Sequence, residues 1–371
     1  MSKETLTNTR LSTYEVDETK TKMKILCLLD GYVKPGDRWL WKYLPGNDDE
    51  LDFLVTSGAV DRFQKWGKLF NYYPAFWRLG LQALIKTRRT PYDLVVAWEG
   101  KNGFPYAVLR SLIGQKHPPL IILAFNIRGV IGHFLGLVRF GLRSVSRVVV
   151  FTPGEVEQYQ RLLSLAPGAI SYFPNGWFDP MKWYEPETAG QSGALARAGK
   201  FVLTSGRSYR DYRTLARAVE GTEVNVKISG RAFNFAGFDL PKNMETLGWL
   251  PYRELQDYIY ASQFYVVPLQ PIDHAGGDSS LLHAMSFSKA VVATRAPSTE
   301  LYVQHGVTGL LVEPGDVEGM RHAILHLWRN PDEAIRMGNA ARRCFEANYK
   351  IDRLAERVYG VAQEVYHAQW G

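Results

Sequence analysis

Short runs of consecutive apolar residues recur along the first half of the chain, with helical patterns between them. Five of these runs are MKILCLLD, LDFLVTS, DLVVAW, PLIILAF and RVVVFT, and such a run is typical of a strand buried on both faces of a parallel sheet. Residues 104–113 and 155–165 have the spacing of helices. Because parallel neighbours are joined by a crossover that is usually helical, the pattern predicts a doubly wound α/β domain.

A second series of apolar runs follows a stretch that is rich in Gly, Ala and Ser. KFVLTSG, VNVKISG, FYVVPL, AVVAT and TGLLVEP again alternate with helical patterns, so we predict a second α/β domain. Ligands of such sheets bind at the carboxyl ends of the strands, and two facing domains place the site in the cleft between them. The predicted parts are a flexible tail over 1–22, an N-terminal domain over 23–180, a linker over 181–199, a C-terminal domain over 200–350 and a helix over 351–371.

Length and composition agree with a two-domain globular protein. The chain has 371 residues, 46% of them hydrophobic, and one domain takes roughly 100–200 residues. Cys27 and Cys344 are too few for a disulfide framework or a metal site of their own. We find no secretory leader pattern and no uninterrupted apolar stretch of the about 18 residues that a membrane span needs. We therefore expect a cytoplasmic protein that is soluble or bound to a membrane surface.

The charge of the chain indicates an anionic partner. A formal net charge of +7 and a pI of about 9.2 suit a phosphorylated small molecule, a membrane surface or a nucleic acid. A nucleic acid is disfavoured, because the sequence contains no recognised binding module. Residues 63–89 interleave cations such as Lys65 and Lys68 with aromatic residues such as Trp66 and Trp77, which is typical of the interface of an anionic membrane. The alternative is an aromatic core with a solvated basic face.

The stretch HAGGDSSLLHAM combines a glycine-rich turn with the start of a helix. Ser279 or Ser280 can cap that helix, while Gly276 and Gly277 let a ligand approach the backbone. Free amides and the helix dipole favour an anion such as a diphosphate at this position. The alternative is an ordinary tight turn before a capped helix.

The order of motifs in the second half carries a family resemblance. The runs FYVVPL, LLHAM, SKAVVAT, STELYVQHGVTGLLVEPGDVEGM and RMGNAARRCFE, in this order, resemble the C-terminal domain of GT-B glycosyltransferases, in particular the retaining family 4 group. FVLTSGRSYRDYRTL, VKISGR and LGWLPYRELQDYIYASQFYVVPL are similar to the same half, and FPNGWFDP resembles the interdomain connection. The resemblance implies a GT-B fold of two Rossmann-like domains facing across a cleft. It also implies that the C-terminal domain holds a nucleotide-sugar donor and the N-terminal domain an acceptor.

The resemblance assigns the donor diphosphate to a glycine and arginine in SGRSYRDY. Gly206 and Arg207 match the family's Gly-Arg pair, whose arginine stabilises the departing nucleotide. Arg210 is our candidate for the family's second cation, which is usually a lysine. For both arginines the alternative is solvated loop charge.

Two further segments correspond to the nucleoside part of the donor. Gly230 and Arg231, in VKISGR, match a turn that passes the base or the ribose in similar enzymes. Tyr252, after LGWLP, stands where the nucleobase commonly lies. A plain strand-to-loop turn remains an alternative for the first segment, and the identity of the base is not readable from either.

The sequence departs from the family where two glutamates, eight residues apart, usually contact the donor. Ala275 and His283 stand in their places. His283 can still hydrogen-bond a ribose hydroxyl, and Asp278, or Asp273, can take over recognition of the sugar or, for Asp278, cap the helix. Glu300 matches a family glutamate after the following strand, and its alternative is an ordinary charge at the start of a helix.

Polar residues after three strands of the first half are candidates for binding the acceptor. They come from DGYVKPGDRWLW, AWEGKNG and FNIRG, which follow the strands at their carboxyl ends. Glu99 is the leading candidate on this side, with an ordinary loop charge as the alternative. The remaining acceptor candidates are Gly31, Arg38, Asn126 and Arg128.

The resemblance leads to a definite functional prediction. We expect transfer of a sugar, with retention of configuration, from a UDP- or GDP-sugar to a hydroxyl of a glycan, a lipid-linked or a small-molecule acceptor. Arg207, Arg210 and the helix start stabilise the diphosphate, so no metal and no other cofactor is expected, and the chain has no Asp-x-Asp triplet. The alternative is a catalytically silent GT-B protein that binds a nucleotide or scaffolds a partner enzyme.

Overall fold

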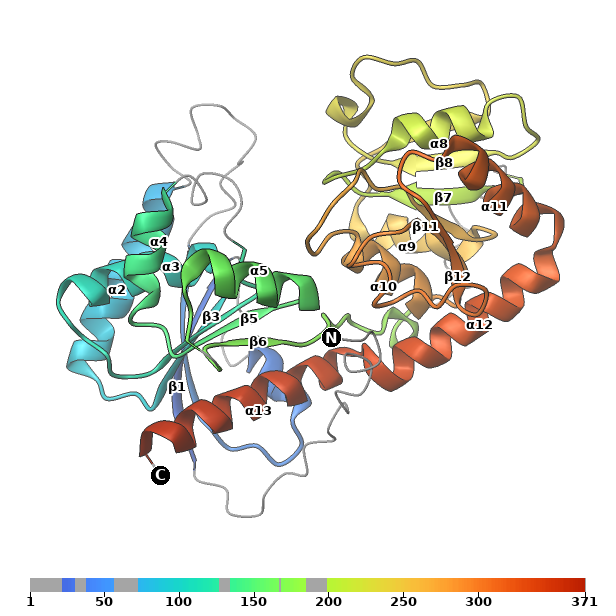
Figure 1. Cartoon of the computed structure of the whole chain (residues 1–371). Coiled ribbons are helices and arrows are strands. Elements are labelled where there is room, and N and C mark those ends of the chain that lie inside the picture. Colours follow the sequence, from blue (N-terminus) through green and yellow to red (C-terminus); the bar gives the residue numbers. More distant parts are fainter. Residues whose placement is uncertain are drawn as a thin grey trace, which may run out of the picture. The chain divides into compact units, whose positions relative to one another are not determined.

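The computed structural model describes residues 22–30, 38–56, 73–126, 134–166, 168–184 and 199–370. Contacts within the chain divide it into two compact α/β units, and their elements are labelled in Figure 1. Unit 1 consists of residues 1–150, 159–171 and 355–371, and unit 2 consists of residues 151–158 and 172–354. No helix in these described ranges combines the length and the apolar character that crossing a membrane requires.

Unit 1 is built on a six-stranded sheet with the strand order β2-β1-β3-β4-β5-β6. The ladders that join β1 to β2 and β3, β3 to β4, and β4 to β5 are parallel. The apolar runs of the sequence are these strands, and the middle of β1, β3 and β4 is buried as expected for a parallel sheet covered on both faces. The elements are β1 (Lys24–Asp30), the 3-10 helix η2 (Trp39–Tyr43), β2 (Glu50–Thr56), α2 (Tyr73–Arg89), β3 (Leu94–Trp98), α3 (Gly100–Leu112), β4 (Leu120–Leu123), α4 (Leu135–Leu142), β5 (Arg147–Val150), α5 (Pro153–Leu163) and β6 (Ile170–Tyr172).

Unit 2 has a second six-stranded sheet, with the order β12-β11-β10-β7-β8-β9, and all its ladders are parallel. The chain reverses its direction of travel across the sheet at β7 and β10, which places the switch point, and so the expected ligand site, between them. The elements are η5 (Pro180–Lys182), β7 (Val202–Ser205), α8 (Tyr212–Val219), β8 (Val226–Ser229), η6 (Ala232–Phe235), β9 (Met244–Gly248), α9 (Tyr252–Ala261), β10 (Tyr265–Val267), α10 (Asp278–Ser286), β11 (Val291–Thr294), β12 (Gly309–Val312), α11 (Val317–Arg329) and α12 (Pro331–Asn348).

Strand β9 is absent from the runs that we identified in the sequence. It lies at the edge of the sheet, beside β8 only, and Glu245 and Thr246 are exposed on it. Glu245 forms an ion pair with Lys227 of β8 at 2.5 Å. An edge strand that is half solvated has no continuous apolar run, so its sequence, METLG, does not stand out.

The terminal helix α13 (Ile351–Trp370) has nearly the predicted bounds, but from Ala355 onward it belongs to unit 1. Its buried face includes Val358, Ala362 and Val365. Glu364 on the same helix accepts a hydrogen bond from Arg147 at 3.2 Å. Unit 1 is therefore discontinuous in sequence, whereas the predicted N-terminal domain is a single segment, because an amphipathic pattern does not indicate which sheet the helix covers.

Candidate functional site

Helix α10 begins one residue earlier than the predicted cap. Gly277 is its N-cap, with φ +79° and ψ −12°, and no side chain caps the helix. A Cβ on Gly277 would lie 3.2 Å from Val267 Cγ1, so both the backbone conformation and the space require glycine. The prediction that Ser279 or Ser280 caps the helix is wrong, because both lie inside its first turn. Gly276 is also crowded, since a Cβ there would lie 2.7 Å from Ile272 Cδ1.

The first turn of α10 leaves amide groups available for a ligand. Leu281 N donates to Gly277 O at 3.0 Å and starts the ladder of the helix. The amides of Asp278, Ser279 and Ser280 precede it, so they have no acceptor within the helix. Ser279 is exposed. The positive end of the helix dipole therefore lies beyond the carboxyl end of β10, a position that stabilises an anion.

Arg210 is a buried cation beside this helix start, with 8% of its surface exposed. Its Nε donates to Ser205 O at 2.9 Å, its Nη1 to Ser208 O at 3.1 Å and its Nη2 to Ser280 Oγ at 2.7 Å. These acceptors are neutral, and within the described ranges no carboxylate forms an ion pair with Arg210. A buried charge without a counter-charge is costly, so this position favours an anionic ligand.

The guanidinium of Arg210 also explains the neighbouring glycine. Gly206 has φ +123°, and a side chain there would collide with the Arg210 guanidinium. Tyr212 OH donates to Gly206 O at 2.7 Å. The loop between β7 and α8 is thus tied to the first turn of α10 through one arginine, a positioning role that the sequence analysis did not anticipate.

Arg207 lies on the same loop but faces an exposed tryptophan. Its guanidinium carbon is 5.8 Å from the ring centroid of Trp249, and that of Arg231 is 5.4 Å from the same ring. Trp249 follows β9 and has 52% of its surface exposed. Asn234 Nδ2 donates to Arg207 O at 2.8 Å and connects the two loops. An exposed aromatic ring between two cations suits a nucleobase. Trp249 lies in the run LGWLP, but nothing in that run distinguishes it from a core residue.

Gly230 directly follows the carboxyl end of β8, next to the loops of Arg207 and Trp249. Its amide donates to Gly248 O at 3.0 Å, and a Cβ on it would lie 3.0 Å from Phe235 Cζ. The loops that carry Gly206, Gly230 and Gly277 therefore all follow carboxyl ends of strands in unit 2, as the sequence analysis expects for the donor residues.

Asp278 has a partner that sequence reasoning missed. Asn175 Nδ2 donates to Asp278 Oδ2 at 2.8 Å, and the Asn175 amide donates to Tyr302 OH at 3.0 Å. Asn175 belongs to FPNGWFDP, which the sequence analysis read only as a connection. The carboxylate of Asp278 does not cap the helix, and its role in sugar recognition stays a prediction.

His283 is buried on α10, with 5% of its surface exposed, rather than displayed to solvent. Tyr252 stacks on its ring at 5.1 Å and 16°, and Trp177 and Phe287 lie at 5.9 and 5.6 Å. Burial lowers the pKa of the His283 imidazole to about 4, so the ring is neutral at pH 7. Its Nε2 has no hydrogen-bond partner among the described residues. A ribose contact stays a prediction for this nitrogen, and Tyr252, with 44% of its surface exposed, is the more accessible of the pair.

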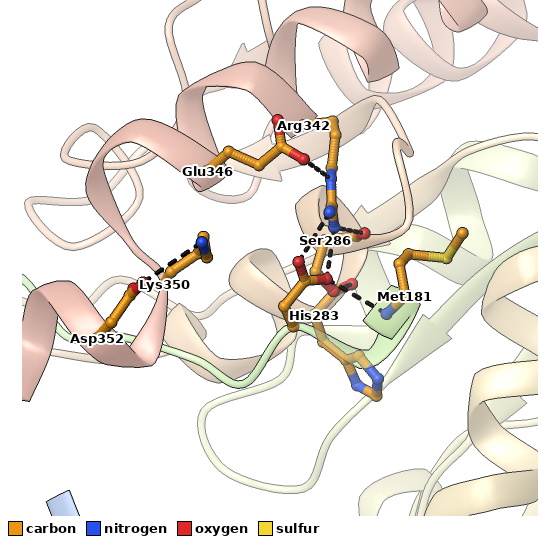
Figure 2. Close-up of polar contacts among 8 residues, drawn as sticks. Met181, His283, Ser286, Arg342, Glu346, Lys350 and Asp352 are labelled. Carbon is orange, nitrogen blue, oxygen red and sulfur yellow. Dashed lines mark hydrogen bonds and ion pairs between the residues drawn. The ribbon is translucent and has the colours of Figure 1, made fainter. Parts of the chain in front are cut away.

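Figure 2 shows how the other end of α10 is held. Ser286 Oγ donates to His283 O at 2.7 Å, and Ser286 O accepts from Arg342 Nη1 of α12 at 2.5 Å. Arg342 also makes a two-pronged ion pair with Asp179, at 2.7 and 2.8 Å. The His283 ring points away from this cluster. Asp179 therefore anchors the segment that contains Asn175 to the helices that carry the candidate site.

Glu300 is engaged in a surface network. It accepts from Arg295 Nη1 at 2.8 Å, and Arg295 Nε donates to Glu313 Oε1 at 2.7 Å. A contact between Glu300 and the donor stays a prediction.

The acceptor candidates of unit 1 fall into three groups. Glu99 follows β3 in a left-handed conformation, with φ +65°, and such strain in a residue other than glycine is concentrated at functional positions. Its Oε2 is 2.7 Å from Lys101 Nζ, which is 2.6 Å from Asp30 Oδ2 at the end of β1. Asn126 lies near this cluster, since its carbonyl oxygen would be 3.5 Å from a Cβ on Gly100.

Arg38 does not reach the carboxyl ends of the strands. Its Nη2 donates to Asn47 Oδ1 at 2.9 Å and to Asp49 O at 3.2 Å, immediately before the amino end of β2. The guanidinium of Arg38 therefore closes the loop before β2, and its contact with the acceptor stays a prediction. Gly31 and Arg128 lie outside the described residues.

Comparisons with known proteins find similar sequences and a similar fold. Residues 212–330 match the family described as Glycosyl transferases group 1. The D-rhamnosyltransferase WbpZ of Pseudomonas aeruginosa is 26% identical over 259 residues, 66% of this chain and 65% of that protein. The GDP-mannose-dependent monoacylated alpha-(1-6)-phosphatidylinositol monomannoside mannosyltransferase of Corynebacterium glutamicum is 26% identical over 129 residues, 34% of either chain. The matches thus span less than two thirds of either relative.

A solved structure extends the similarity to the whole fold. Anabaena Alr3699/HepE, in complex with UDP and glucose, superposes with a TM-score of 0.67 at 17% identity, over 92% of this chain and 100% of the other. Two Rossmann-like units with parallel sheets define the class, a GT-B protein. The family match in unit 2 and the Pseudomonas relative agree with the resemblance to group 1 glycosyltransferases that the sequence carries. Assignment to the retaining family 4 stays a prediction.

Proposed function

We propose that this chain transfers a sugar from a nucleotide-sugar donor to an acceptor hydroxyl. The observation that supports the proposal best is the buried Arg210 beside three available amides of α10. Two sources of positive potential meet there, without a carboxylate partner for the cation. A donor diphosphate supplies the missing negative charge. Arg210 and the amides of α10 stabilise the nucleoside diphosphate as it leaves and the glycosidic bond breaks.

The proposed chemistry places little demand on an enzymic base. We expect retention of configuration, with the acceptor hydroxyl attacking from the side that the diphosphate leaves and a phosphate oxygen taking its proton. Arg207, Arg210 and the start of α10 act as the electrostatic stabilisers, so the reaction needs no metal ion in this scheme. Retention and independence of metal both follow from the resemblance to family 4.

For the donor we propose a UDP- or GDP-sugar. GDP-mannose appears in the name of the Corynebacterium relative, and UDP with glucose is bound in the Anabaena structure. The ring of Trp249, flanked by Arg207 and Arg231, together with Tyr252 suits the base, and His283 beneath Tyr252 suits the ribose. Asp278, the first residue of α10, is the candidate carboxylate for the sugar hydroxyls.

For the acceptor we propose a glycan, a lipid-linked or a small-molecule hydroxyl bound by unit 1. Glu99 and Asp30 offer carboxylate oxygens on either side of Lys101, and carboxylates accept hydrogen bonds from hydroxyl groups. We also propose a cytoplasmic location with contact to the inner face of a membrane, which brings a lipid-linked acceptor within reach.

A silent GT-B protein is the second candidate. Ala275 and the buried His283 replace the two family glutamates, so the contacts that orient the donor sugar differ from those of similar enzymes. Binding of a nucleotide without transfer is the property that would distinguish this candidate.

The first experiment is a thermal-shift panel of UDP, GDP, ADP and dTDP with their sugar conjugates. One base family should stabilise the chain, by about 2.7 kcal/mol at a ligand concentration of 100 Kd. Arg207→Ala should weaken that nucleotide roughly 10- to 100-fold, since hydrogen bonds to charged groups contribute about 1.5–3 kcal/mol. Arg213→Ala is the matched control, because Arg213 is exposed on the same unit and contacts Gly237 O and the Phe238 ring rather than the candidate site.

The outcomes separate the candidates. Stabilisation by a nucleotide-sugar that is hydrolysed or transferred supports the enzyme. Stabilisation without any turnover across an acceptor panel supports the silent protein. A panel that stabilises nothing overturns the donor site itself.

A further inference from the structure

Three neighbouring helices of unit 1 contain no acidic residue. The sequences of α2, α3 and α4 lack Asp and Glu, and they include Arg78, Lys86, Arg88 and Arg89 on α2. The absence of acids continues along the chain, from residue 100 to residue 154. Ordinary surface helices carry both signs of charge, so this side of unit 1 has a one-sided electrostatic potential.

The three helices form one surface. Tyr106 OH of α3 donates to Thr87 Oγ1 of α2 at 3.2 Å, and Ser111 Oγ of α3 donates to Gly141 O of α4 at 3.1 Å. A Cβ on Gly80 would lie 2.7 Å from Tyr106 N, so α2 and α3 pack with their backbones close together. Figure 1 shows the helices side by side.

Helix α2 exposes an apolar stripe in addition to its buried face. Phe76, Leu79, Ala83 and Leu84 are buried. Trp77, Leu81 and Ile85 follow at intervals of four residues, with 40%, 48% and 44% of their surfaces exposed. A four-residue spacing puts side chains on the same face of a helix.

Exposed cations border this stripe. Arg78, Arg88 and Arg89 are exposed, and none of them pairs with a carboxylate of a described residue. Lys86 differs, since its Nζ is 3.1 Å from Asp52 Oδ2. We call the six residues Trp77, Arg78, Leu81, Ile85, Arg88 and Arg89 the α2 face.

An anionic membrane matches both features of the α2 face, the apolar stripe and the cations. An anionic bilayer accepts Trp and aliphatic side chains at the boundary of head groups and acyl chains, and it attracts Arg side chains at the same depth. A second copy of this chain would bring arginines against arginines, without acids to compensate. A nucleic acid would attract the arginines but leave the apolar stripe unmatched.

We propose that the α2 face docks unit 1 on the surface of an anionic phospholipid membrane. The proposal concerns binding, not catalysis, and it does not depend on the nature of the sugar transfer. Within the predicted segment 63–89, the proposal concerns residues 73–89 alone. Lys65, Trp66 and Lys68 lie outside the described residues.

The test is sedimentation of the full chain with vesicles of phosphatidylcholine alone or mixed with phosphatidylglycerol. The wild type should sediment with the mixed vesicles at low salt, and added salt should weaken the binding. The triple variant Arg78→Gln, Arg88→Gln, Arg89→Gln should lower the partition coefficient at least ~10-fold, since each basic residue near an anionic surface contributes measurably. The double variant Leu81→Ser, Ile85→Ser should lower it at low and high salt alike.

A matched control comes from unit 2. Ile335 on α12 is 60% exposed, and Arg336 beside it pairs with Glu333. The double variant Ile335→Ser, Arg336→Gln should bind vesicles like the wild type. An unchanged circular dichroism spectrum and an unchanged thermal midpoint of unit 1, which contains α2, establish that each α2 variant is folded.

Three results would overturn the proposal. The wild type does not sediment with the anionic vesicles at low salt, or it sediments equally with neutral vesicles, or either α2 variant binds as well as the control. A change in oligomeric state of the α2 variants, measured by light scattering and without a change in vesicle binding, would instead assign the face to a second copy of the chain.

Discussion

Two arginines three residues apart have different environments, although their sequence context is similar. Arg207 contacts an exposed tryptophan, whereas Arg210 is buried and donates to three neutral oxygens. The Arg207 guanidinium faces Trp249, whereas that of Arg210 bonds the backbone of the loop, which is why Arg207 is the choice for the nucleotide-binding test. Arg210 combines a charge for the ligand with a structural connection, so its removal would affect both.

His283 provides a prediction about pH at the residue scale. Its pKa in the folded chain is lowered from 6.5 to about 4 by burial. The stability that depends on the neutral ring is complete above pH 6.5 and is lost as the pH falls through 4. Between these limits the wild type should lose up to about 3 kcal/mol relative to His283→Phe, which does not titrate there.

The measurement is the free energy of unfolding of the two proteins, by denaturant titration at several pH values between 7 and 4. Parallel pH profiles for the wild type and the variant would mean that His283 does not titrate in this range, and the buried, neutral assignment would fail.

At the scale of elements, the start of α10 combines a strained backbone with a tight contact. Gly277 needs a positive φ and lies against Val267. Gly277→Ala should destabilise the chain by about 1–3 kcal/mol, and it should also weaken nucleotide binding by displacing the first-turn amides. Thermal unfolding with and without nucleotide measures both effects.

Gly315 is the matched control for this substitution. It also has a positive φ, +74°, but a Cβ on it would meet nothing within 4 Å. Gly315→Ala should lower the free energy of unfolding only through the strained backbone conformation, and it should leave nucleotide binding unchanged. Equal loss of nucleotide binding in both variants would contradict the role of the α10 start.

At the scale of the whole molecule, the terminal helix belongs to a unit that is distant in sequence. Val358, Ala362 and Val365 are buried and belong with unit 1, while unit 2 ends at Leu354. Removal of residues 355–371 should expose the core of unit 1, lower its thermal midpoint and cause aggregation. Unit 2 should keep its nucleotide-induced shift.

A shorter truncation controls for loss of the chain end. Trp370 is 54% exposed, so removal of residues 370–371 should change neither the midpoint nor the nucleotide shift. An unaltered unit 1 in the longer truncation would mean that α13 is dispensable for its fold.

Much of the fold was predictable because buried parallel strands produce continuous apolar runs. All ten runs that we identified are strands, and the two further strands of the structure, β6 and β9, lie at the edges of their sheets. The edge strand β9 was missed because its solvated side interrupts the run. The donor loops were also predictable, since Gly206, Gly230 and Gly277 follow strands at their carboxyl ends.

The sequence by itself determined the class of fold, the order of the strands along the chain and the glycine loops of the donor site, because these depend on local periodicity and backbone conformation. Only the tertiary structure decided that Arg210 is buried with no carboxylate partner among the described residues and that His283 lies under Tyr252. It also decided that Arg38 bonds the loop before β2 and that α13 packs on unit 1. Each of these depends on contacts between residues far apart in sequence, and a local pattern has no information about which surfaces meet.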